Sequence, residues 1–161
     1  MIMSRESSAK NSRRSNARLV AVQAIYQVNF VPQSASQVIS EFHNYPYCDP
    51  TNSPTGDSTD KAFFSLLVGG VIQRLSEIDA MISSMLAAHD LDRLERVLAA
   101  ILRVGTYELL DCADTPARVA INEYVNLTRA FFDGEQPSLA NGVLDGLARE
   151  LRPAEFSDAA S

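Results

Sequence analysis

Apolar side chains recur at intervals of three and four residues through most of this chain. Between residues 17 and 30 the recurring set is Ala17, Val20, Ala21, Ala24, Ile25 and Val28. A second apolar stripe on another side of the same segment contains Leu19, Tyr26 and Phe30. A helix that is apolar on two sides is expected to pack between other helices. The same spacing predicts helices over about 34–43, 60–88, 92–109, 115–132 and 138–151. No segment shows convincing two-residue alternation bounded by hairpin turns, so the expected fold class is all-α.

Capping residues and turns set the expected helix ends. Ser34, Asp60 and Asp92 each precede an apolar periodic run and are typical N-caps, and Thr115-Pro116 is a strong helix start. The glycine pair 69–70 lies inside the run 60–88, where each glycine costs about 1 kcal/mol. A close helix–helix contact at this pair is therefore expected. The alternative, a phosphate-binding loop, is excluded because no strand precedes the pair and no Gly-Lys-Ser/Thr follows.

The segment 45–60 is rich in Pro, Ser, Thr, Asp and Asn, which is typical of a loop. It divides the chain into an expected N-terminal helical subdomain at 13–44, a flexible loop at 45–59 and a C-terminal helical subdomain at 60–152. Residues 1–12 are expected to be a disordered basic arm and residues 153–161 a disordered tail.

Positive charge gathers at the start of an acidic chain. Residues 1–18 hold five basic side chains and one acidic, whereas the rest holds nine basic and nineteen acidic. Such an asymmetry is often the mark of a segment that contacts a polyanion, and the alternative is a solvated terminus.

The composition favours a non-catalytic protein without a cofactor or metal. No run approaches the roughly 18 apolar residues of a membrane span, and no signal peptide is evident, so a cytoplasmic location is expected. Cys48, Cys112, His43 and His89 are isolated, so no zinc site is expected. A cysteine nucleophile would need a histidine brought close by the fold, which is a remote alternative.

Glu108 and Glu123 are candidate acid or base residues, but no nucleophile, metal motif or Gly-rich loop accompanies them. Structural hydrogen bonds between helices are the favoured interpretation of both carboxylates.

Four stretches carry a family likeness. They are RRSNARLVAVQAIYQ (13–27), LLVGGVIQRLSEIDAMI (66–82), LAAILRVGTYELL (98–110), and PARVAINEYVNLTRAFF with NGVLD (116–132 and 141–145). In order and spacing they resemble the NusB family of bacterial transcription antitermination proteins. The resemblance implies two packed bundles of about seven helices. It also implies binding of single-stranded boxA-type RNA together with NusE, a small-subunit ribosomal protein. It further implies assembly with RNA polymerase and other Nus factors, mainly on ribosomal RNA operons.

With this resemblance, the basic segment is interpreted as the RNA-binding edge, carried by Lys10, Arg13, Arg14 and Arg18. Guanidinium groups bind phosphate oxygens in bidentate fashion, and a helix N-terminus adds positive potential. Arg14 and Arg18 are four residues apart and share a helix face, and these side chains are expected to be exposed. Tyr107 and Glu108 are expected to border a surface for the protein partner.

The chain departs from the family pattern before NGVLD. Family members commonly have Lys-Phe-Val there, near the RNA path, whereas this chain has Ser138-Leu139-Ala140, and Glu135 precedes them. Weaker RNA binding by the protein alone, with greater dependence on NusE, is therefore expected. Two alternative functions remain: an RNA-recognition module that serves a ribosomal-RNA methyltransferase, and a helical protein-interaction module without RNA. The oligomeric state and the RNA sequence preference stay open.

Overall fold

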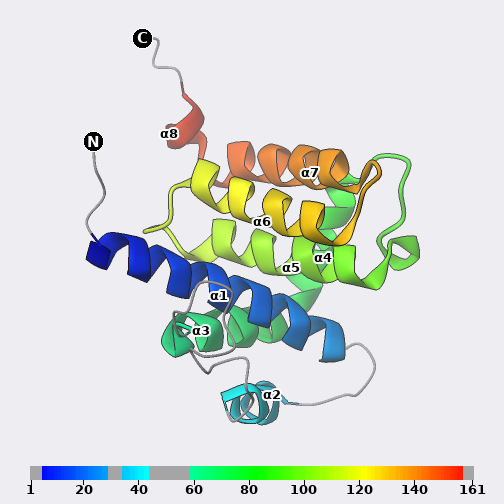
Figure 1. Ribbon diagram of the computed structural model, residues 1–161. Helices are drawn as coiled ribbons and strands as arrows, with labels where there is room; N and C mark the ends of the chain where they lie inside the picture. Colours follow the sequence, from blue (N-terminus) through cyan, green and yellow to red (C-terminus); the bar gives the residue numbers. More distant parts are fainter. Residues whose placement is uncertain (1–4, 29–33, 44–58, 158–161) are drawn as a thin grey trace. The chain divides into compact units, whose positions relative to one another are not determined.

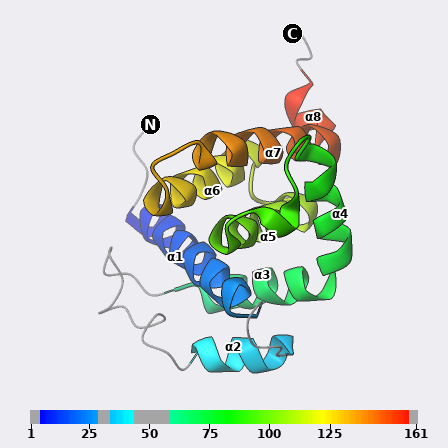
Figure 2. The same ribbon diagram turned by 90° about the vertical axis from the view of Figure 1, so that its right-hand side faces the viewer.

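The structure is a computed structural model that describes residues 5–28, 34–43 and 59–157. Figures 1 and 2 show that the described residues form helices joined by short connections. No strand occurs in these three ranges, so the predicted all-α fold is confirmed. The chain divides into two compact units, Met1–Gln73 and Arg74–Ser161. None of the helices described is both long and apolar enough to cross a membrane.

Unit 1 contains α1 (Arg5–Val28), α2 (Ala35–His43) and α3 (Lys61–Gln73). Helix α3 packs against both α1 and α2, as Figure 1 shows. Its buried residues are Phe63, Phe64, Leu67, Val68, Gly70 and Val71. The rings of Phe42 and Phe64 approach to 6.0 Å between centroids. The core of this unit thus forms around the apolar face of α3.

Helix α1 begins at Arg5, so the disordered arm predicted over residues 1–12 is wrong for residues 5–12. The segment 5–28 contains neither glycine nor proline. Once the packed part of a helix has formed, each further residue adds a backbone hydrogen bond at little cost. The helix therefore extends beyond its buried part into the polar N-terminal sequence.

Unit 2 contains five α-helices and one short 3₁₀ helix among its described residues. They are α4 (Leu75–Met85), η3 (Leu91–Arg93), α5 (Arg96–Asp111), α6 (Ala117–Phe131), α7 (Gln136–Leu151) and α8 (Pro153–Phe156). Helix α5 is central and packs against α4, α6 and α7 (Figure 2). Eleven of its sixteen residues are buried, which makes it the core of the unit. At Gly105 an added Cβ would lie 3.1 Å from Tyr124 Cγ and 3.2 Å from Leu144 Cδ2, so the absent side chain permits close packing.

The single helix predicted over 60–88 is wrong, because the chain turns at Arg74 between α3 and α4. Helix α3 buries its apolar face against α1 and α2, whereas α4 buries its face against α5 and α7. The two halves of the apolar run therefore serve different cores, and Leu75 between them is exposed. The boundary between the units follows the same break, at 73/74. Residues 60–73 thus belong with the N-terminal unit and not with the predicted subdomain 60–152.

Several predicted helix ends are confirmed. Ser34 Oγ accepts the backbone N–H of Gln37 at 3.2 Å, and Asp60 Oδ1 accepts the N–H of Phe63 at 3.0 Å. The expected cap at Asp92 is wrong, since α5 starts after Glu95. Of the glycine pair 69–70, where a close contact was expected, Gly69 makes none, because an added Cβ there would meet nothing within 4 Å, whereas Gly70 is buried. The loop predicted over 45–59 lies outside the described residues up to residue 58.

Residues at the turn between α7 and α8 form hydrogen bonds with the end of α5 and the start of α6. The disordered tail predicted over residues 153–161 is therefore wrong for residues 153–156. Arg152 donates hydrogen bonds to the backbone carbonyl oxygens of Glu108, Leu109, Cys112 and Thr115 at the end of α5 and in the turn to α6. Glu155 Oε1 accepts the backbone N–H of Ala117 at the start of α6, at 2.8 Å. That hydrogen bond, with the Arg152 guanidinium at 3.1 Å, lowers the pKa of Glu155. A tail would have no such partners, and these contacts hold the segment in place.

Candidate nucleic-acid interface

Lys10 and Arg13 form the accessible part of the predicted basic face. Lys10 is exposed and Arg13 is half-buried in α1, one turn before the apolar stripe of that helix becomes buried. The carbonyl oxygen of Arg13 accepts the backbone N–H of Asp60 at 3.1 Å, which ties this turn of α1 to the start of α3. Among the described residues, neither Lys10 nor Arg13 has an ion-pair partner. Their charges are thus available to an anionic ligand.

Arg14 and Arg18 instead converge on an aromatic ring of α3. Their guanidinium carbons lie 4.3 and 5.1 Å from the centroid of Phe63. Arg18 is 3% exposed, and Arg14 Nε also lies 3.9 Å from Asp60 Oδ2. The expected exposure of the arginines is therefore wrong for Arg18. It lies beside Ala17 and Ala21 on the buried face of α1, where a guanidinium stacked on an aromatic ring tolerates burial.

Tyr107 and Glu108 do not border a surface, so the partner role predicted for their side chains is contradicted. Tyr107 is 3% exposed and Glu108 is fully buried. Tyr124 of α6 donates its hydroxyl hydrogen bond to Glu108 Oε1 at 2.7 Å, so the interhelical interpretation of Glu108 is confirmed. Tyr107 donates to Asp111 Oδ2 at 3.0 Å, and burial together with this bond raises the pKa of Tyr107 to about 12. Both residues stabilise the end of α5.

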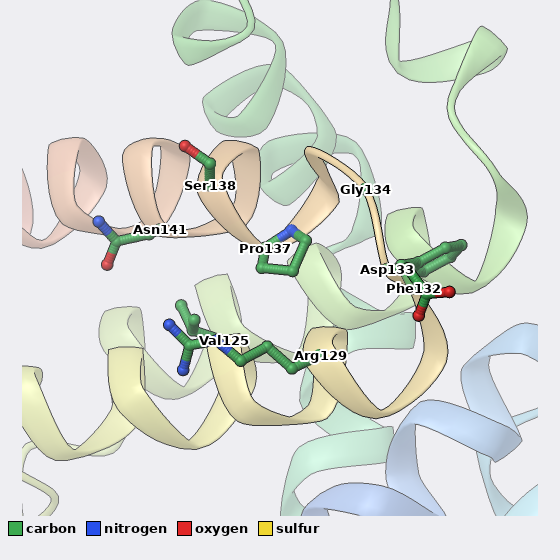
Figure 3. A pocket seen from close by; sticks show the side chains of 8 residues that line it. All are labelled: Val125, Arg129, Phe132, Asp133, Gly134, Pro137, Ser138 and Asn141. Atoms are coloured by element: carbon green, nitrogen blue, oxygen red, sulfur yellow. The ribbon is translucent and has the colours of Figure 1, made fainter.

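A groove between α6 and α7 was not identified from the sequence. Its larger part, about 710 Å³, lies beside the turn that joins the two helices. A smaller part, about 230 Å³, extends toward the start of α6 and shares Val125, Arg129 and Asn141 with the first. Figure 3 shows the Arg129 side chain lying along α6 with its guanidinium beside Val125, and Asn141 on α7 across the groove from α6. Ser138, the residue at which the chain departs from the family pattern, lines the larger part.

The sequence did contain a signal for this groove. Arg118, Asn122, Val125 and Arg129 are separated by four, three and four residues, which places them on one face of α6. This signal is weaker in the sequence than that of the N-terminus, where basic residues are adjacent. On α6 the two arginines are eleven residues apart and are interrupted by other residues.

The described residues contain no group of three His, Cys, Asp or Glu side chains that could hold a metal ion. Cys112 is buried at the end of α5, and Cys48 lies outside the described residues.

Comparison with known proteins gives a consistent result. Residues 15–149 match the NusB family. The transcription antitermination protein NusB of Maricaulis maris is 42% identical over 156 residues, which are 95% of this chain and 98% of that protein. The protein of the same name from Sphingopyxis alaskensis is 41% identical over 86% of this chain and 94% of its own length. Among solved structures, T. maritima NusB superimposes with a TM-score of 0.73 at 29% identity, covering 89% of this chain and 96% of that one.

Proposed function

This chain belongs to the NusB family, and on that basis we propose that it is a transcription antitermination factor that binds RNA. The RNA is single-stranded and of the boxA type, bound together with NusE, the small-subunit ribosomal protein. The complex joins RNA polymerase and other Nus factors, mainly on ribosomal RNA operons. The protein acts in the cytoplasm, by binding and not by catalysis.

The observation that carries this proposal is the likeness to relatives named as transcription antitermination proteins over nearly their whole length. A likeness confined to one domain of a larger enzyme would have favoured the methyltransferase alternative. The full-length correspondence favours antitermination instead.

Lys10 and Arg13 are the residues that best suit phosphate contact. Their side chains lie in the second and third turns of α1, before the part of the helix that is buried. Arg14 contributes from its partly exposed position over Phe63, and Arg18 supports the face from beneath by its contact with the same ring. Of the four expected RNA-binding residues, Lys10, Arg13 and Arg14 thus contact RNA, and Arg18 supports the surface from beneath.

A second protein supplies much of the affinity. Two accessible cations give a sequence-tolerant attraction, whereas specific recognition of single strands uses base-edge contacts and stacking. Glu135 is exposed in the turn between α6 and α7, and Ser138 brings no charge to the groove beside it. NusE is expected to contribute the missing contacts.

The test is a titration of boxA-type RNA with this protein alone, with NusE alone and with their mixture, each repeated with a scrambled RNA. We expect the mixture to bind boxA RNA at least about tenfold more tightly than either protein, a coupling free energy of about 1.4 kcal/mol. Equal affinity for boxA and scrambled RNA in the mixture would contradict the proposal. So would full affinity and discrimination by this protein without NusE, which would exclude the adaptor role.

A further inference from the structure

The groove between α6 and α7 carries positive charge that the protein itself does not neutralise. Arg118 lines its smaller part, and Arg129 lines both parts. In unit 2, ion pairs engage Arg74, Arg103, Arg149 and Arg152. Within the described residues, Arg118 and Arg129 have none. Two cations on one wall of a groove therefore lack a carboxylate partner.

The geometry of both arginines leaves donors available to a ligand. The guanidinium of Arg118 lies 4.9 Å from the ring centroid of Phe156 in α8. A cation–π contact does not occupy the guanidinium N–H groups with an oxygen acceptor, so these donors remain available to a ligand. Arg129 Nη1 donates one hydrogen bond to Asn126 Oδ1 at 3.0 Å, which orients the group and leaves other N–H donors unused. Each arginine is thus held in place and retains the fork that binds phosphate oxygens in bidentate fashion.

The rest of the groove is polar and carries little apolar surface. Asn122 and Asn141 line it with amide groups that both donate and accept hydrogen bonds. In the smaller part the apolar lining residues Ile121 and Val125 are only 7% and 5% exposed, and the larger part adds the half-buried Phe132 and Pro137 beside the turn. An amphipathic helix needs a row of apolar pockets for its anchor side chains, and the smaller part of the groove, between Arg118 and Arg129, offers none. Its chemistry suits a polar, anionic strand.

The carboxylates near the groove limit where an anionic ligand can bind, but they do not neutralise the two arginines. Asp145 lines the smaller part, but it accepts a hydrogen bond from Arg149 Nε at 2.9 Å, so its charge is already paired. Asp133 lies at the end next to the turn, beyond Arg129, as Figure 3 shows. The positive stretch therefore extends from Arg129 toward Arg118 and away from the turn.

We propose that this groove binds the sugar–phosphate backbone of single-stranded RNA. Arg118 and Arg129 contact phosphates, and Asn122 and Asn141 contact sugar hydroxyls or base edges between them. Eleven residues of helix separate the two arginines by about 16 Å, a length that spans about four or five stacked nucleotides. This site extends the proposed function, on which it rests, by adding an RNA contact in unit 2 to the basic residues of α1.

The test compares the salt dependence of RNA binding by the wild type and by the double variant Arg118→Gln/Arg129→Gln. The probe is an unstructured RNA of about 12 nucleotides, within the range of single-strand site sizes. Each lost phosphate contact lowers the slope of log K against log salt by about 0.7, so the double variant is expected to lose about 1.4. The matched control is Arg93→Gln, which removes an exposed arginine outside the groove and is expected to leave the slope unchanged.

A second measurement uses the wild-type protein, because loss of the Arg118–Phe156 contact also affects α8. RNA that carries photoreactive uridines is crosslinked to the protein, and the modified peptides are identified. Crosslinks in 118–145 as well as in α1 are expected. Crosslinks in α1 alone, with unchanged slope in the double variant, overturn this site and leave the proposed function intact. Failure of the wild type to bind RNA at all overturns the proposed function and this site together. Loss of NusE binding by the double variant, with RNA binding unchanged, makes the groove a protein-docking surface and also overturns the site.

Discussion

Arg18 carries a positive charge and yet contributes to the core of unit 1. Its side chain is 3% exposed, and its guanidinium, like that of Arg14, lies over the ring of Phe63. Burial of an arginine stem removes apolar surface from water, so such a residue stabilises the fold through packing as well as charge.

Replacing Arg18 with Ala is expected to lower the free energy of unfolding by about 1–3 kcal/mol, in the range of core truncations. Lys10→Ala, at an exposed position of the same helix, is expected to change it by less than about 0.5 kcal/mol. Urea denaturation midpoints at constant slope measure both. Equal stability of the two variants would show that the Phe63 contact contributes nothing.

Alanine substitutions at two helical glycines are expected to change the stability of the protein in opposite directions. Gly105→Ala is expected to destabilise the protein by about 1–3 kcal/mol, because the new Cβ would crowd Tyr124 and Leu144 at the centre of unit 2. Gly69→Ala in α3 meets no neighbour and is expected to stabilise by about 0.5–1 kcal/mol through helix propensity. Thermal unfolding of both variants provides the test, and a loss of stability in Gly69→Ala would contradict the packing described.

At the residue level, the sequence contained an indication that Arg18 is buried. The step from Arg14 to Arg18 continues to Ala21 and Ile25 along one face of α1, so periodicity alone placed Arg18 among buried residues. Its charge suggested exposure instead. The deciding fact is Phe63, 45 positions later, and no local pattern reveals that an aromatic ring from another helix will cover a guanidinium.

At the scale of helices, Arg152 and Glu155 act as caps for elements to which they do not belong. The last carbonyl groups of a helix and its first N–H groups lack partners within the helix. Arg152 satisfies the carbonyl groups at the end of α5, and Glu155 satisfies an N–H group at the start of α6. One short segment thus satisfies backbone groups both at the end of α5 and at the start of α6.

Arg152→Ala is expected to cost about 2–4 kcal/mol, because several partly buried carbonyl oxygens lose a charged donor at once. Arg152→Lys is the matched control, since it retains the charge but not the planar fork. We expect the lysine variant to recover less than half of the loss in denaturant titrations. Full recovery would mean that charge alone matters at this corner.

Glu155→Gln is expected to remove a pH dependence of stability. The folded-state pKa of Glu155 lies below its ordinary value of 4.5, so its carboxylate stabilises the protein above that pH. This stabilisation is lost as the pH falls through the folded pKa. The stability difference between wild type and variant should therefore be constant near pH 7 and shrink as the pH falls below 4.5. Urea midpoints across this range measure it, and a constant difference would exclude Glu155 as the group responsible.

The helix boundaries that were predicted correctly depend on local chemistry, as at Ser34 and Asp60, whose side chains cap within three residues. The break at Arg74 was missed because apolar spacing continues across it. Only the tertiary packing of α3 and α4 into different cores shows why the run is interrupted. The caps from Arg152 and Glu155 were missed for the same reason, since their partners lie about forty residues earlier.

At the scale of the whole molecule, the division between units falls inside a run that looks continuous in sequence. Helix α3 belongs to the core formed with α1 and α2, although the loop-like composition of the sequence before it suggested the opposite assignment.

A fragment that starts at Arg74 is therefore expected to fold cooperatively, because α5 and the helices around it make a core of their own. A fragment that starts at residue 60 carries α3 without α1 and α2, so its apolar face is exposed. We expect the longer fragment to bind the dye ANS and to aggregate more readily, as measured by fluorescence and light scattering. Stronger ANS binding and aggregation by the fragment that starts at Arg74 would place α3 in unit 2.

On the ribosome, α5 and α6 are synthesised before their caps exist. The carbonyl groups bound by Arg152 precede it by 37 to 44 residues, and the N–H group bound by Glu155 precedes it by 38. At typical rates of translation this is an interval of about 2 to 9 s. During that time the carbonyl groups at the end of α5 lack the donor groups of Arg152. They must form hydrogen bonds with water, or be covered by a chaperone, until Arg152 has been synthesised and has folded into place.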